Sequence, residues 1–224
     1  MRSGRLLAIG LGLAVALSSS AAATGAPTVA RRCPPRGAAV LAGHAHARIY
    51  LLRSHPVRGT VAERAWYGCL RGRRKHRLLA VYYGDVEEKG ELSVALPRVR
   101  GVWAAWVEDS AVFLPGTDPP CERRLTIHRT NLRTGRRTAL TLPGYQPGGR
   151  ATCSTAEVVT DLALSPRGKL AWIQSDPTPQ VFAFNARTPR LLDAGAGIEL
   201  TSLGVEMTIA YWTRDGEERF ARLP

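Results

Sequence analysis

The sequence predicts an all-β protein whose short strands recur in similar groups. After residue 30 the apolar runs are short, often alternate with polar residues, and are rich in Val, Ile, Trp, Tyr and Phe. This is the pattern of half-buried strands. The 22 glycines and 15 prolines of the 224-residue chain mostly fall between these runs, where they favour turns and would break any long helix.

Residues 1–26 are predicted to be a secretory signal peptide. Arg2 and Arg5 precede an apolar run over residues 6–17, and the small residues 21–23 (AAA) offer a cleavage site. The apolar run is shorter than the ~20 residues that span a bilayer, and no later run approaches that length. We therefore expect a secreted or extracytoplasmic protein with no membrane span after cleavage; an uncleaved anchor is the alternative.

The mature part contains all four cysteines, Cys33, Cys69, Cys121 and Cys153. An even number in an exported chain predicts disulfide bonds, and three pairings are open. None of the spacings is C-x-x-C, so a zinc site or a thioredoxin-like redox pair is not indicated. No metal site and no cofactor is expected.

Aligning the chain with itself shows that groups of strands recur. Each group contains a strand, a tight turn, a strand with Ala before an aromatic residue, a loop, a third strand, an Asn-x-Arg-Thr turn and a fourth strand. The matching segments are residues 159–164 with 200–205, 170–173 with 209–212 and 104–107, and 131–136 with 185–190.

Four such groups are found, at residues 38–83, 91–142, 157–193 and 198–223. Four strands in about 40 to 50 residues are typical of a β-propeller blade, which must stack on its neighbours to bury both of its faces. We predict a small β-propeller of about four blades over residues 27–224. An open half-propeller that completes itself by dimerising, or an internally duplicated β-sandwich, are the alternatives. The last group lacks its outermost strand, which the N-terminal segment could supply.

This topology also predicts the disulfide pairing. In an up-and-down blade the loop between the second and third strands opens on the same face as the link to the next blade. Cys121 lies in the first kind of loop and Cys153 in the second, so these two can meet. Cys33 would then tie the N-terminal arm to Cys69 in the first blade.

One hairpin carries a family resemblance. Residues 162–172 (LALSPRGKLAW) resemble the inner hairpin of bacterial envelope β-propeller repeats, and residues 67–74 (YGCLRGRR) are similar to a pattern in uncharacterised exported proteins of high-GC bacteria. The resemblance implies a fold, and no activity comes with it.

The chain has a net charge of +13, and its strongest charge feature is the segment of residues 71–77 (RGRRKHR). Its cations, Arg71, Arg73, Arg74, Lys75 and Arg77, could bind a polyanion. Outside the cell we expect an anionic cell-wall polymer or lipid headgroups rather than nucleic acid. The alternative is an exposed hairpin turn whose arginines only reflect genome composition.

Other motifs predict packing more than chemistry. The pair His44 and His46 and the acidic residues 85–91 lack the further ligands of a metal or calcium site. The tryptophans recur with the groups and are expected to pack between blades, with Trp103 and Trp106 facing opposite layers because their parity differs.

No motif for a catalytic nucleophile, metalloprotease or phosphate-binding loop is present, so no catalytic residue is assigned.

The expected function is therefore a non-enzymatic binding or scaffold protein, with an unknown ligand or protein at one loop face. A small hydrolase or lyase with its site at the propeller axis is one alternative. A basic wall-associated protein is the other.

Overall fold

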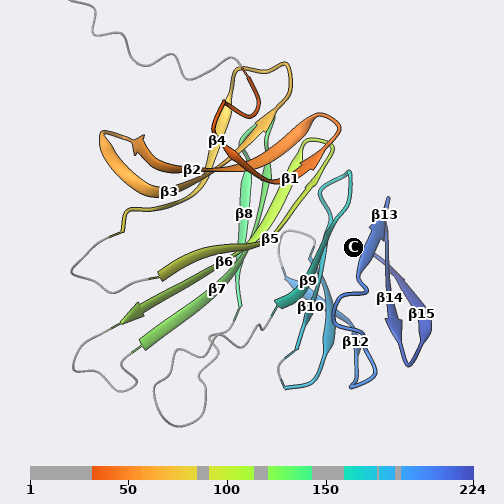
Figure 1. Cartoon of the computed structure of the whole chain (residues 1–224). Helices are drawn as coiled ribbons and strands as arrows, with labels where there is room; N and C mark the ends of the chain where they lie inside the picture. Colours follow the sequence, from red (N-terminus) through yellow and green to blue (C-terminus); the bar gives the residue numbers. More distant parts are fainter. Residues whose placement is uncertain (1–31, 85–90, 114–120, 143–158, 176, 185–187) are drawn as a thin grey trace, which may run out of the picture.

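The chain folds into four separate antiparallel sheets that stand side by side (Figure 1). The computed structural model describes residues 32–84, 91–113, 121–142, 159–175, 177–184 and 188–224, and these residues contain fifteen strands and no helix. The expected signal peptide, the acidic loop over residues 85–90 and Cys153 lie outside the described residues.

Each predicted group of strands forms one sheet, with its strands in chain order from one edge to the other. The first sheet contains β1 (Ala39–His44), β2 (Ala47–Val57), β3 (Thr60–Leu70) and β4 (His76–Tyr82). The second contains β5 (Glu91–Arg100), β6 (Trp103–Phe113), β7 (Cys121–Asn131) and β8 (Arg137–Thr141). The third contains β9 (Val159–Leu164), β10 (Leu170–Gln174), β11 (Gln180–Phe184) and β12 (Pro189–Ala194). The fourth has only β13 (Gly204–Glu206), β14 (Ile209–Arg214) and β15 (Glu217–Arg222), so the predicted lack of an outermost strand is confirmed.

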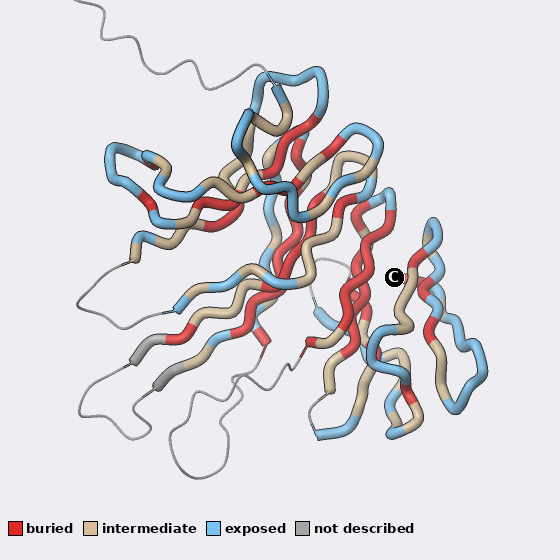
Figure 2. The backbone as a smooth tube through the Cα atoms, viewed as in Figure 1, coloured by how far each residue is buried: buried red, intermediate tan, exposed pale blue. Residues whose placement is uncertain are grey.

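Buried apolar clusters lie between successive sheets, as expected for blades, and a smaller cluster contains only residues of the first sheet. Figure 2 shows that buried positions occur along strands of all four sheets. Trp66 and Trp106 are buried between the first and second sheets, Trp172 between the second and third, and Trp212 between the third and fourth. Trp103 packs on the opposite side of the second sheet from Trp106. The predicted role of the tryptophans and the predicted difference between these two are confirmed.

The sequence alignment of the last group is wrong by one residue. It matched Tyr211 with Trp172, whereas Trp212 is the residue that faces the preceding sheet, as Trp172 does in the third sheet. Because neighbouring residues of a strand point to opposite faces, a slip of one position exchanges the buried and exposed sets. Tyr211 therefore lies on the outer face, where its side chain is 38% exposed.

The four sheets form an arc and not a closed ring (Figure 1). Among the described residues, buried apolar clusters join the first sheet to the second, the second to the third and the third to the fourth, and none joins the fourth to the first. The fold is thus an open propeller-like arrangement, which corresponds to the half-propeller alternative. Sheets that follow one another as separate layers do not form the two facing sheets of a sandwich.

The antiparallel strand order gives the molecule two loop faces. The turns after the first and third strand of each sheet lie on one face, which we call the hairpin face. The turns after the second strand and the links between sheets lie on the other, the link face. Cys121 begins β7 on the link face, whereas its predicted partner is outside the described residues.

The disulfide between Cys33 and Cys69 is present, so this predicted pairing is confirmed. It joins the arm before β1 to the fully buried Cys69 of β3. The arm is thereby held on the side of the first sheet away from the second.

Candidate anion-binding face

Two arginine-bearing turns lie next to each other on the hairpin face. The first joins β3 to β4 over residues 71–75, and the second joins β7 to β8 over residues 132–136. We call them the paired basic turns. Their cations are all exposed: Arg71, Arg73, Arg74, Lys75, Arg133 and Arg136.

Arg77 ties the two turns together instead of standing free beside the other predicted cations. Its Nε donates to the carbonyl oxygen of Leu132 at 3.4 Å, and its Nη2 donates to that of Arg133 at 3.1 Å. The guanidinium reaches these carbonyls because Arg77 is at the beginning of β4, directly beside the turn of the second sheet. Four of the five cations predicted from the sequence are therefore exposed in the first turn, and the fifth positions the second turn.

Leu132 docks the second turn on the first sheet. Its side chain is 2% exposed and packs against Gly68 of β3. A Cβ atom at Gly68 would lie 2.4 Å from Leu132 Cδ2, so glycine is what allows this approach. The contact buries an apolar side chain at the tip of a charged turn, and it places the flanking arginines at the surface.

The second turn has a backbone fixed by its own side chains. Asn131 Oδ1 accepts hydrogen bonds from the N–H groups of Arg133 and Thr134, both at 3.0 Å. Gly135 has a φ of +82°, which favours glycine, and a Cβ there would lie 2.7 Å from the Arg77 guanidinium carbon. This accounts for the Asn-x-Arg-Thr-Gly spacing, which combines a side-chain-capped turn with a left-handed residue.

The first turn is tied to the β1–β2 turn on the same face. Arg71 N–H donates to the carbonyl oxygen of His46 at 2.6 Å, and the Tyr50 hydroxyl contacts His76 Nδ1 at 2.5 Å. Burial, with the neighbouring Tyr67, raises the pKa of Tyr50, so this hydroxyl stays protonated and can donate. Three turns from two sheets thus form one connected surface.

Among the described residues, no acidic side chain pairs with the positive charges of this surface. Within the described chain, no side-chain ion pair involves any cation of the paired basic turns. The described turns of the hairpin face contain no Asp or Glu at all, at residues 45–46, 71–75, 101–102, 132–136, 165–168 and 207–208. Exposed cations gathered without counter-charges create a positive potential that attracts polyanions.

Sequence reasoning found the first turn and missed the second. Arg133 and Arg136 were visible only as part of a recurring turn and not as neighbours of residues 71–75, because more than fifty residues separate them along the chain. The usable signal was the repeat itself, since equivalent turns of adjacent blades emerge on the same face.

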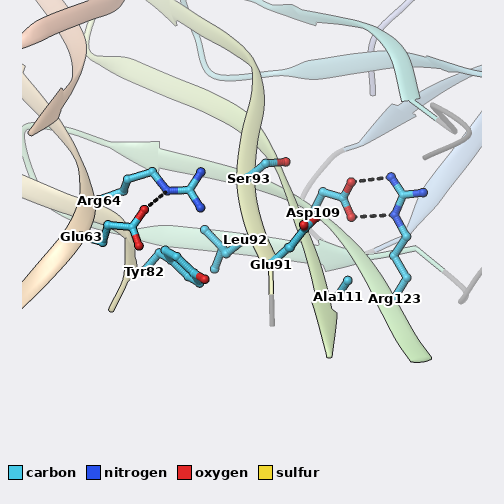
Figure 3. Close-up of a pocket in the computed structure, with 9 residues that line it drawn as sticks. All are labelled: Glu63, Arg64, Tyr82, Glu91, Leu92, Ser93, Asp109, Ala111 and Arg123. Atoms are coloured by element: carbon cyan, nitrogen blue, oxygen red, sulfur yellow. Dashed lines mark hydrogen bonds and ion pairs between the residues drawn. The ribbon is translucent and has the colours of Figure 1, made fainter. Parts of the chain in front are cut away.

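A second feature is a cavity of about 330 Å³ between the first and second sheets (Figure 3). It opens where β3 and β5 begin and β4 ends, and it is lined by Glu63, Arg64, Tyr82, Glu91, Leu92, Ser93, Asp109, Ala111 and Arg123. Its lining residues come from the strands of these two blades.

The charged groups of the cavity are largely engaged with each other. Arg123 donates through Nε to one oxygen of Asp109 at 2.8 Å and through Nη2 to the other at 2.5 Å. The Arg64 guanidinium lies 4.6 Å from the centre of the Tyr82 ring and pairs with Glu63 at 3.7 Å. In this bidentate pair both carboxylate oxygens of Asp109 accept hydrogen bonds from Arg123. The cavity is therefore polar, and its charged side chains mostly pair with each other.

The described residues contain neither a candidate metal-binding group nor a candidate membrane-spanning helix. They contain no group of three or more His, Cys, Asp or Glu side chains that could hold a metal ion. A search of the same residues also finds no helix that is long and apolar enough to cross a membrane.

No protein family and no curated protein matches the sequence. Solved structures with some likeness include an acylaminoacyl peptidase of Pyrococcus horikoshii, at 18% identity and a TM-score of 0.37 over 55% of this chain and 17% of that one. The β-propeller domain of the Trilobed protease from Pyrococcus furiosus, described as having an open velcro topology, is 16% identical at a TM-score of 0.37, over 54% and 33% of the two chains. A chain of the mitotic checkpoint complex is 14% identical at a TM-score of 0.31, over 81% and 60%. This chain therefore spans less than two thirds of each of these chains.

Proposed function

We propose that the protein is an exported, non-enzymatic binding protein that holds an anionic polymer of the cell envelope on its hairpin face. The observation that carries the proposal is the Arg77 bridge, because it turns two separate basic turns into one surface. The cations of both turns then act on the same polymer chain.

Several features support this choice of ligand. A flexible polymer with a negative charge on each repeat unit can follow an irregular row of arginines, whereas a small ligand needs an enclosed site. Arginine presents a fork of donors that matches phosphate and carboxylate groups. The disulfide and the expected leader over residues 1–26 favour a site outside the cytosol, where the available polyanions are envelope polymers. The resemblance to exported envelope proteins fits the same location.

The proposal is tested by binding of the disulfide-intact protein to immobilised poly(glycerol phosphate) and to polyglutamate, with duplex DNA as a comparison. We expect binding that weakens as salt is raised, because the contacts are exposed and screened. The variant Arg73→Ser/Arg74→Ser is expected to bind about thirtyfold more weakly, since each exposed cation beside an anionic surface contributes on the order of 1 kcal/mol.

The matched control is Arg53→Ser/Arg190→Ser, which removes the same charge from exposed positions elsewhere. It is expected to bind nearly as the unchanged protein does. Equal losses in the two variants would show that only net charge matters. That result, like binding to none of the polymers at low salt, would overturn the proposal; stronger binding to DNA than to both envelope-type polymers would contradict its choice of ligand.

A further inference from the structure

The outer edge of β15 has a charge and aromatic pattern that is complementary to itself. β15 is the last strand of the only described sheet with three strands, and no described strand pairs with its outer side. Phe220 lies in its middle and is 75% exposed. The unpaired N–H and C=O groups of an edge strand are a template for pairing with another strand, and exposed apolar side chains on that strand favour the pairing.

The register shows which backbone groups are available. Leu223 N–H donates to the carbonyl oxygen of Thr208, so Leu223 faces β14. Groups alternate along an antiparallel strand, and Ile209 is paired with Arg222 and Tyr211 with Phe220. The N–H and C=O groups of Glu218, Phe220 and Arg222 therefore point away from β14, toward the open edge.

The side chains of these same residues share one face of the sheet. Glu218 and Arg222 are exposed and flank Phe220 at two positions on either side. Tyr211 lies beside Phe220 on the neighbouring strand, so the apolar centre extends inward from the edge. When such a strand pairs with an antiparallel copy of itself about the aromatic residue, each charged side chain lies opposite a partner side chain of opposite charge.

We propose that two copies of this chain associate through their β15 edges, with a two-fold axis at Phe220. In this register Phe220 lies opposite the partner's Phe220, Glu218 opposite the partner's Arg222, and Arg222 opposite the partner's Glu218. All outward backbone groups of the three residues find partners, and both cross-strand charge pairs are attractive. The two three-stranded sheets become one continuous sheet.

Neighbouring registers are worse. A shift that centres the pairing on Arg219 places Arg219 opposite the partner's Arg219 and leaves Phe220 opposite the partner's Glu218. A shift toward Ala221 places Glu218 opposite the partner's Pro224, which has no N–H group to donate to the Glu218 carbonyl oxygen. The Phe220 register alone combines the longest overlap with complementary charges, and the contact is isologous, as a closed dimer requires.

The test is sedimentation equilibrium of the full disulfide-intact protein over a wide concentration range. We expect a reversible monomer–dimer equilibrium. Glu218→Arg, and separately Arg222→Glu, would each place like charges opposite one another twice, so each is expected to raise the dimer dissociation constant about tenfold or more. The swapped variant Glu218→Arg/Arg222→Glu restores both attractive pairs and is expected to dimerise nearly as well as the unchanged protein.

Glu206→Arg is the control for Glu218→Arg, because it makes the same charge change at an exposed residue on β13, away from the edge. It is expected to leave the dissociation constant unchanged. Hydrogen exchange supplies a second readout: the amides of Glu218, Phe220 and Arg222 should become protected only as concentration rises. A protein that stays monomeric throughout, failure of the swap to restore dimers, or edge amides protected equally at all dilutions would overturn the proposal; the last result would mean that a strand of the same chain occupies the edge.

Discussion

At the scale of single residues, the buried carboxylate of Asp161 connects three sheets. One carboxylate oxygen accepts from Leu162 N–H at 2.8 Å and from the Arg98 guanidinium of the second sheet at 3.1 Å. The other accepts from Leu203 N–H, just before the fourth sheet, at 3.0 Å. Asp161 itself is 6% exposed, so these partners replace the water that the carboxylate loses on burial.

Asp161→Ala is expected to lower the free energy of unfolding by about 3 kcal/mol, because it leaves buried donors without their acceptor. Urea denaturation followed by tryptophan fluorescence measures the change. Glu206→Ala, at an exposed position, should change the same quantity by less than about 0.5 kcal/mol. Similar small effects of both variants would contradict the role of Asp161 as a junction.

Glu108 makes a contribution to the stability of the fold that is lost in acid. A hydrogen bond from His128 holds the pKa of Glu108 below its usual value of 4.5, helped by electrostatic attraction to His128 and Arg137 and opposed by burial. His128 Nε2 is 3.4 Å from the carboxylate, and its ring stacks on Trp106. A carboxylate with a lowered folded pKa stabilises the protein above its unfolded pKa, and that contribution is lost as pH falls through the folded value.

We therefore expect Glu108→Gln to be less stable than the unchanged protein near neutral pH, with the difference shrinking as the pH is lowered below about 4.5. Denaturant titrations at a series of pH values measure this difference. A difference in stability between the two proteins that stays constant or grows on acidification would contradict this role of Glu108.

At the scale of elements, the β7–β8 turn depends on the contact between Leu132 and Gly68. Gly68→Ala forces the new Cβ into the Leu132 side chain, and overpacking of this kind costs about 2 kcal/mol. The same substitution in a Leu132→Ala background should cost much less, because the obstructing atoms are gone. A thermodynamic cycle of the two single variants and the double variant measures the coupling, and additive effects would show that the contact does not govern docking.

At the scale of the whole molecule, the two ends of the arc are finished differently. The first sheet has its outer side tied to the N-terminal arm by the disulfide of Cys33 and Cys69, with Tyr50 and Tyr67 stacked on that side. The last sheet exposes Tyr211 and Phe220 on its outer side. The fourth sheet therefore offers exposed aromatic side chains at the end of the arc where the dimer is proposed.

Replacing both cysteines, as in Cys33→Ser/Cys69→Ser, is expected to lower the free energy of unfolding by about 3 to 4 kcal/mol, since a loop of 36 residues is no longer closed in the unfolded chain. Chemical denaturation of the purified variant tests this value. The pairing itself is checked by non-reducing peptide mapping, in which a Cys33 linked to any other cysteine would refute it.

The sequence by itself was sufficient to predict which residues form each group of strands. Short alternating runs separated by Gly and Pro placed each sheet nearly where it lies, because side-chain period and turn residues are local properties of the chain. The same local signals identified Trp66, Trp106, Trp172 and Trp212 as packing residues and residues 71–77 as a basic segment, of which residues 71–75 form the turn.

Three things were decided only by the tertiary structure. The strand-face assignment of Tyr211 and Trp212 required the register, since local similarity tolerates a slip of one residue and the buried layer does not. The role of Arg77 and the partnership of Arg133 and Arg136 with the first turn required two sheets to pack. The open arc required the stacking of all four sheets, because whether sheets close into a ring depends on the angles between them, and no local sequence pattern encodes these angles.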